Sequence, residues 1–200
     1  MRHAQTKILL AYWNRLRGSR AAPERGEIEP SDIREILGDT FILDISPQLR
    51  TISFRLAGTR LCAAFGKELK SYGYLGLWDE DDNFEIARAI SRVYNDYTPV
   101  LISHTARTDS GKFVEFETLL LPLMPIAEGS ARVLGVSTPK KVPYWLGAEA
   151  LTANQCKGLR SLTVPGEAPP LVPEFSENAA TGEQMSRKVG HLTVLTGGKS

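Results

Sequence analysis

The spacing of apolar positions along this chain changes several times, and the changes predict an α+β domain. Five segments alternate apolar and polar side chains, as strands with one buried face do. They are residues 40–46, 52–57, 99–107, 112–123 and 132–138. Three segments repeat apolar side chains every three or four positions, which is typical of helices with one buried face. They are residues 6–17, 59–65 and 84–97. This order, two strands, helices and three more strands, favours an antiparallel sheet with helices over one face.

The first helix carries one apolar stripe and several basic side chains outside it. Leu9, Tyr12, Trp13 and Leu16 lie on the stripe. Such a helix packs on a sheet, on the same helix of a second subunit, or on an anionic membrane surface. We favour packing over the membrane, because only one face is apolar and acidic residues follow. We therefore predict that these four residues form an interface with the open face of the sheet or with a second copy.

Changes in composition and in apolar spacing along the chain predict three parts. Residues 1–38 form an N-terminal helical extension, residues 39–139 the folded domain, and residues 140–200 a C-terminal extension that is largely irregular or disordered. Within the last part, residues 159–164 have the composition of a short strand. Residues 166–187 are rich in proline and polar side chains, so we expect them to be disordered.

Composition narrows the class of protein without identifying it. The chain has 200 residues, of which 42% are hydrophobic and 24% charged, as in an ordinary globular protein. Its 24 Lys and Arg residues balance 23 Asp and Glu residues, which argues against a nucleic-acid partner. Two cysteines give neither a disulfide framework nor metal-ligand spacing. We expect a cytoplasmic protein.

The most informative stretch is residues 54–78, FRLAGTRLCAAFGKELKSYGYLGLW. A strand leads into a short helix that ends in Phe65-Gly66, followed by Glu68-Leu69 and then Leu77-Trp78. This order resembles the PAS domain family, and most closely the small stand-alone bacterial PAS proteins with a Tyr-Trp helix at the N-terminus. The resemblance implies five antiparallel strands in the order 2-1-5-4-3. It also implies a non-catalytic domain for sensing or protein interaction, acting through a protein partner or homodimerisation.

The resemblance further implies a small-molecule pocket in the core. The candidate lining residues are Phe54, Leu56, Leu61, Phe65, Trp78, Ile90, Ile102, His104 and Phe116. Apolar side chains alone do not distinguish a filled core from a pocket.

His104 is the polar exception in this set. It shares a strand face with Val100 and Ile102, so it is a core histidine, a haem ligand or a polar anchor for a ligand. We favour the first of these. Flavin photochemistry is disfavoured as well, because Cys62 precedes the reactive position of light-sensing PAS domains. No cofactor is evident.

Two other classes of function compete with the sensory reading. One is a small cone-shaped α+β enzyme or ligand-binding protein with a pocket near His104, which for catalysis needs a carboxylate beside the histidine. Glu115 and Glu117 fall on the strand face opposite Phe116. The other is a membrane-surface adaptor that uses the basic N-terminal helix. The acidic residues 79–83 are read as helix capping and not as a metal site.

Overall fold

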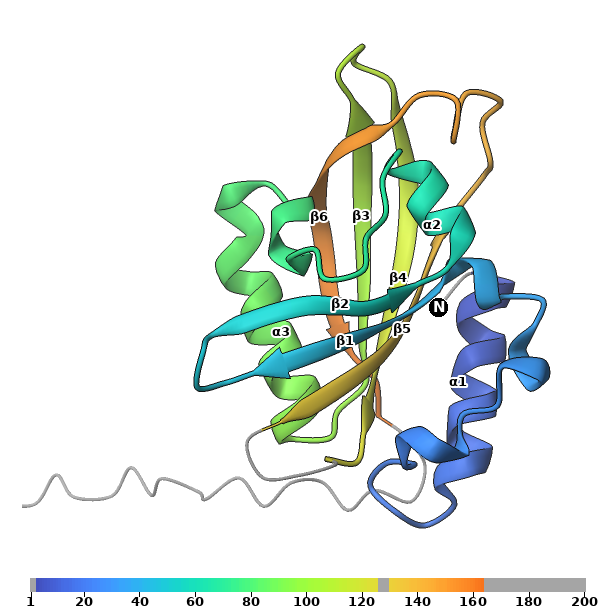
Figure 1. Cartoon of the computed structure of the whole chain (residues 1–200), viewed down its shortest axis with the longest axis vertical. Helices are drawn as coiled ribbons and strands as arrows, with labels where there is room; N and C mark the ends of the chain where they lie inside the picture. The colour runs from blue at the N-terminus through green and yellow to red at the C-terminus, as the bar shows by residue number, and fades with distance from the viewer. Residues whose placement is uncertain (1–2, 126–129, 164–200) are drawn as a thin grey trace, which may run out of the picture. The chain divides into compact units, whose positions relative to one another are not determined.

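A twisted six-stranded antiparallel sheet forms the centre of the structure, a computed structural model that describes residues 3–125 and 130–163. The strands are β1 (Thr40–Ser46), β2 (Thr51–Ala57), β3 (Val100–Thr108), β4 (Phe113–Leu123), β5 (Ala131–Pro139) and β6 (Leu151–Ser161). Their order is β2-β1-β5-β4-β3-β6. Figure 1 shows β1 and β2 crossing β3 and β4 steeply, because the right-handed twist accumulates across the sheet. The predicted α+β class and the order 2-1-5-4-3 are confirmed, with β6 added beside β3.

The inner face of the sheet is covered by α2 (Thr59–Ala64), α3 (Asn83–Asn95) and short 3₁₀ turns. α3 buries one face, formed by Ile86, Ala89, Ile90 and Val93. These side chains meet the inward residues of β1, β3 and β4 in the larger of two hydrophobic cores. Alternation along the strands divides the sheet into these two sides.

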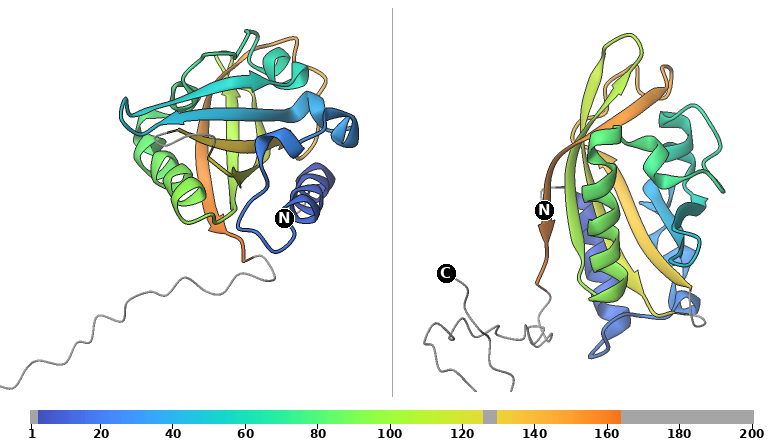
Figure 2. Two further views of the ribbon diagram at one scale, coloured as in Figure 1. Left: turned by 60° about the horizontal axis from the view of Figure 1, so that its bottom comes forward. Right: turned by 90° about the vertical axis from the view of Figure 1, so that its left-hand side faces the viewer.

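The outer face of the sheet is covered by α1 (Ala4–Arg17). Leu9 and Trp13 are 0% and 1% exposed, Tyr12 is buried, and Leu16 is half-buried. The indole Nε1 of Trp13 donates a hydrogen bond of 2.7 Å to the Pro122 carbonyl in β4. The apolar stripe therefore packs on the sheet of its own chain, the first of the two placements predicted for it. Figure 2 shows α1 and α3 on different sides of the sheet.

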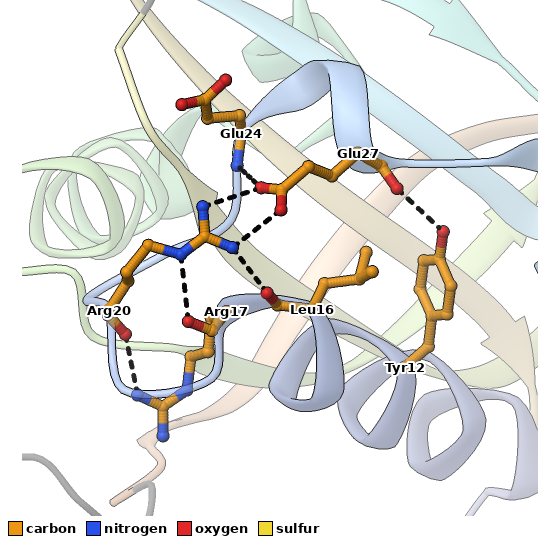
Figure 3. A network of polar contacts seen from close by, with 6 residues as sticks. All are labelled: Tyr12, Leu16, Arg17, Arg20, Glu24 and Glu27. Carbon is orange, nitrogen blue, oxygen red and sulfur yellow. Dashed lines mark hydrogen bonds and ion pairs between the residues drawn. The ribbon is translucent and has the colours of Figure 1, made fainter.

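The connector after α1 is held by a network around Arg20 (Figure 3). Arg20 makes two hydrogen bonds to the Glu27 carboxylate, at 2.8 and 3.0 Å, and a third to the Leu16 carbonyl at 2.6 Å. Glu27 in turn accepts the backbone N–H of Glu24. These bonds satisfy carbonyl groups at the C-terminus of α1, which lack partners inside the helix. The connector then continues through two 3₁₀ turns, Pro30–Ile33 and Leu37–Asp39, before β1 begins.

One predicted pocket residue, Leu56, lies on the other side of the sheet. Ile42 pairs with Leu56 and Leu43 with Phe54, so Arg55 is an extra residue in β2. Such a β-bulge sends the residues on either side of it to opposite faces. Phe54 accordingly packs in the inner core, whereas Leu56 packs against the outer core with α1. The prediction for Leu56 was wrong because it assumed unbroken alternation.

The sixth strand starts earlier than the sequence suggests. The expected short strand over residues 159–164 is an eleven-residue strand, Leu151–Ser161, paired with β3 along nearly its whole length. Most of its side chains are exposed or half-buried, so the apolar alternation that reveals a strand is weak. Residues 166–187, where we predict disorder, lie outside the described residues.

None of the helices within residues 3–125 and 130–163 has the length and apolar character needed to span a membrane.

Candidate functional site

His104 lies in the inner core, on the face of β3 where the sequence places it. Its side chain is 4% exposed. The ring of Phe116 stacks on it with centroids 5.4 Å apart, and the ring of Trp78 is tilted against it at 4.9 Å. β4 supplies Phe116, the direct pairing partner of His104, and the 3₁₀ turn after α2 delivers Trp78. The histidine is thus enclosed by aromatic side chains.

A chain of hydroxyl groups connects His104 to the neighbouring strands. The Nε2 atom of His104 is 2.9 Å from Thr118 Oγ1 in β4. The Thr118 hydroxyl in turn donates a hydrogen bond of 2.7 Å to Ser137 Oγ in β5. The Thr118 oxygen therefore accepts from Nε2–H, which leaves Nδ1 of the neutral ring as an acceptor.

Three polar atoms around this ring are buried without a hydrogen bond among the residues that the structure describes. They are Trp78 Nε1, His104 Nδ1 and Asn154 Oδ1. Asn154 comes from β6, and its backbone pairs with Trp78. The side chains of Asn154 and His104 lie close to each other, and so do those of Tyr74 and Trp78, although neither pair reaches hydrogen-bonding geometry. We refer to Trp78, His104, Thr118, Ser137 and Asn154 as the His104 cluster.

Burial keeps His104 neutral and predicts a loss of stability in acid. Desolvation lowers the pKa of His104 from 6.5 to about 3, and the nearby Asn154 only partly opposes this shift. Below pH 6.5 the unfolded chain therefore binds a proton that the folded chain does not. Stability is lost as the pH falls from 6.5 towards 3, by about 1.4 kcal/mol per pH unit.

His104→Gln is expected to remove this part of the acid sensitivity. Between pH 7 and pH 5 the free energy of unfolding should fall by about 2 kcal/mol more in the wild type than in the variant. Urea denaturation at the two pH values measures this difference. Equal pH dependence of the two proteins would show that folding does not shift the pKa of His104.

The structure brings eight of the nine predicted pocket residues into one inner core. Seven of them belong to its hydrophobic cluster, His104 contacts two of these seven, Trp78 and Phe116, and only Leu56 lies elsewhere. Sequence reasoning missed the polar members of the His104 cluster. Thr118 interrupts an apolar strand face, which is a usable signal. The sequence gives no such signal for Ser137. It gives none for Asn154 either, because Asn154 lies in β6, whose position was mispredicted.

A cleft of about 420 Å³, the α2 cleft, reaches two predicted pocket residues from outside. Leu61 and Phe116 line it, together with Ser137 of the His104 cluster. At its rim, Arg60 holds Asp39 through two hydrogen bonds of 2.7 and 2.9 Å. These bonds raise the pKa of the Arg60 guanidinium. An apolar cleft of this size with a few polar groups suits a small molecule.

A second, more polar cleft of about 450 Å³ lies on the outer face beside the start of α1. Glu117 is buried there and accepts hydrogen bonds from Thr6 Oγ1 at 2.7 Å and the His3 backbone N–H at 3.2 Å. Its carboxylate is therefore on the side of the sheet opposite the His104 ring. The acid–base pair required by the enzyme alternative is not formed by these residues.

The acidic residues after Trp78 make structural contacts. Asp79 forms two hydrogen bonds to Arg107, at 2.6 and 2.7 Å, which lower the pKa of Asp79. Asp82 accepts the Cys156 backbone N–H at 2.6 Å. Asp82 takes the N-cap position of α3, as the capping prediction requires, but its side chain makes no capping hydrogen bond there. No group of three potential metal ligands occurs in the described part of the chain.

Haem binding requires a free ring nitrogen of His104. Nε2 is occupied by Thr118, and Nδ1 is buried within the aromatic enclosure. The packed site as it stands does not fit a haem group.

Comparisons with solved structures give weak similarities. The N-terminal domain of a diguanylate cyclase with PAS/PAC sensor from Marinobacter aquaeolei is 12% identical, with a TM-score of 0.38, over 50% of this chain and 94% of that one. The PAS domain of an HTR-like protein from Haloarcula marismortui is 17% identical, with a TM-score of 0.39, over 55% and 90%. The PAS domain of a protein from Colwellia psychrerythraea is 15% identical, with a TM-score of 0.38, over 56% and 97%. Similarities at these scores do not assign the chain to a family.

Comparisons with curated sequences and with family profiles decide the family of the chain. No curated protein sequence matches the chain. The profile described as PAS domain matches residues 1–138, which is more than half of the 200 residues and includes α1. The chain therefore belongs to the PAS domain family.

Proposed function

We propose that this protein is a non-catalytic, cytoplasmic sensory domain of bacterial signalling. It binds a small molecule at the His104 cluster and passes the signal to a partner protein or a second copy of itself. The membership in the PAS domain family supports a sensory role. The site and the ligand class are argued from the residues of this chain.

The observation that carries the proposal is the set of unpaired polar atoms in the His104 cluster. Each such buried atom costs about 1–3 kcal/mol, so folded proteins rarely retain several of them together. The set comprises one donor, Trp78 Nε1–H, and two acceptors, His104 Nδ1 and Asn154 Oδ1. A small molecule with hydroxyl or amide groups satisfies all three atoms, because such groups both donate and accept.

The α2 cleft touches this cluster at Ser137. Ser137 is 8% exposed and lines the cleft. It accepts a hydrogen bond from Thr118, whose hydroxyl is also hydrogen-bonded to His104. A ligand that enters beside Leu61 and Phe116 therefore meets a hydroxyl already connected to the histidine. Thr118 and Ser137 are paired across β4 and β5. A ligand that moves either hydroxyl group would therefore change the contact between these two strands.

Native mass spectrometry of the purified protein tests this proposal. We expect the wild type to carry a small-molecule adduct that survives gentle desolvation. Trp78→Phe keeps an aromatic ring but removes the N–H donor, so it should lose most of the adduct. Trp145→Phe is the matched control, because Trp145 is buried in the same core and is not among the unpaired atoms. A wild type without adduct, or an adduct unaffected by Trp78→Phe, would refute the site.

A further inference from the structure

β6 lies at one edge of the sheet, and a bulge divides this strand into two halves. Cys156 pairs with His104 and Gly158 with Ser103, so Lys157 between them is the extra residue of the bulge. An extra residue shifts the alternation of the backbone groups that follow it. The two halves of β6 therefore present their outward backbone groups at different positions.

The edge of the first half is occupied by the segment that follows Trp78. The Asp79 backbone N–H donates a hydrogen bond of 2.9 Å to the Asn154 carbonyl. The Asp82 carboxylate accepts the Cys156 backbone N–H at 2.6 Å. These contacts use the outward backbone groups of β6 as far as the bulge.

The edge of the second half is open in the part of the chain that the structure describes. The Leu162 N–H donates a hydrogen bond of 2.8 Å to the Pro99 carbonyl, at the start of β3. Because hydrogen-bonding groups alternate in direction along an antiparallel strand, Leu159 and Ser161 point theirs away from β3. Among the described residues no hydrogen bond reaches these outward groups. An unpaired edge of this kind is a template for a further strand.

Exposed arginine side chains surround this open edge. Arg88 and Arg92 of α3 line a crevice together with Ser161, and in the right-hand view of Figure 2 this half of β6 runs alongside α3. Arg160 lines the same crevice and also the polar cleft on the outer face. Neither Arg92 nor Arg160 forms an ion pair among the described residues. The crevice has one acidic lining residue, Glu85, 3.6 Å from Arg88, so its net charge is positive.

The size of the crevice favours a peptide over a small molecule. Its volume is about 40 Å³, whereas pockets for small molecules have roughly 300 Å³ or more. A strand added to a sheet edge needs no deep pocket, because its main chain supplies the hydrogen bonds and its side chains reach the surface on either side. Carboxylate groups are the side chains that arginine binds best, often through two parallel hydrogen bonds.

We propose that an acidic, extended segment of a partner protein adds as a further strand to the open edge of β6. Its backbone pairs with the outward groups of Leu159 and Ser161, and its carboxylates bind the three arginines. β6 also contributes Asn154 to the His104 cluster, so a ligand there would act on the strand that holds the partner. As a signalling output this docking rests on the proposed function; as a binding event it does not.

Fluorescence anisotropy of a labelled peptide, titrated with the full chain, tests the proposal. The probe is a hexapeptide of alternating Glu and Thr, blocked at both ends, and the control probe has Lys in place of Glu. Threonine favours the extended conformation without adding charge. We expect the acidic probe to bind at least about tenfold more tightly than the basic one, and less tightly as the salt concentration rises.

Variants of the protein separate backbone pairing from charge. Arg92→Glu should weaken binding of the acidic probe by about fivefold or more, whereas Arg34→Glu, exposed in the connector before β1, is the matched control and should bind as the wild type does. Ser161→Pro removes one outward N–H and should weaken binding by about tenfold. Ser161→Ala keeps this N–H and should have no effect. All three positions are exposed, so the variants should keep the wild-type circular dichroism spectrum.

Three results would overturn the proposal. The first is equal binding of the acidic and basic probes, and the second is acidic-probe binding that Ser161→Pro leaves unchanged, which would indicate charge attraction without strand pairing. The third is a wild-type dimer in sedimentation velocity that Ser161→Pro dissociates, since a second copy would then occupy the edge. Native mass spectra decide ligand sensing separately: a protein that binds the acidic probe but carries no small molecule would refute sensing and leave the docking intact.

Discussion

Replacing Trp13 with alanine is expected to lower the free energy of unfolding by about 3–5 kcal/mol, the usual cost of truncating a buried tryptophan. Trp13 is 1% exposed between α1 and the sheet. Its loss leaves a cavity and also deprives the Pro122 carbonyl of its 2.7 Å hydrogen bond. The effect should appear as a lower urea midpoint with an unchanged slope, because the same surface is exposed on unfolding.

Two variants separate the contributions at this position. Trp13→Phe retains most of the volume, so its cost of about 1–3 kcal/mol reports the unpaired carbonyl. Ile8→Ala, in the same helix but 39% exposed, should cost no more than about 0.5 kcal/mol. If Trp13→Ala costs as little as Ile8→Ala, then α1 does not pack on the sheet, and its stripe is free for another partner.

Gly135→Ala should destabilise the protein by about 1–3 kcal/mol although it adds a single methyl group. Gly135 in β5 pairs with Phe41 in β1, and the ring of Phe41 lies directly over the glycine. A Cβ atom at Gly135 would meet ring atoms of Phe41 at 2.2 and 2.4 Å. Phe41 is itself 1% exposed and packs on Phe54 and Tyr74, so it has little room to move.

Gly158→Ala in β6 is the control for this clash. No atom lies within 4 Å of a Cβ at that position. Alanine there should be neutral or slightly stabilising, because it restricts the unfolded chain. Urea denaturation of both variants measures the contrast. Combining Gly135→Ala with Phe41→Leu should recover part of the loss, and equal costs of the two alanine substitutions would refute the packing of Phe41.

Hydrophobic spacing predicted most of the fold because strands β1 to β5 each have one face in a large core. Their predicted and observed ends differ by one residue at most. The spacing gave wrong predictions where a strand buries few side chains or where a bulge interrupts its alternation. β6 is an edge strand with few buried side chains, and the bulge at Arg55 reverses the orientation of Leu56 without any change in composition.

The candidate site was predictable in its centre but not in its surroundings. His104 could be singled out because a polar residue interrupts an apolar strand face. Its environment depends on residues from three strands and a turn, far apart in the sequence. Single-sequence patterns contain no information about such long-range neighbours.

The most direct test of the central claim is a high-resolution crystal structure of the protein as purified. We predict density for a bound molecule larger than water, within hydrogen-bonding distance of Trp78 Nε1, His104 Nδ1 and Asn154 Oδ1. The claim would be contradicted if these three atoms were hydrogen-bonded to one another, or if water alone satisfied them.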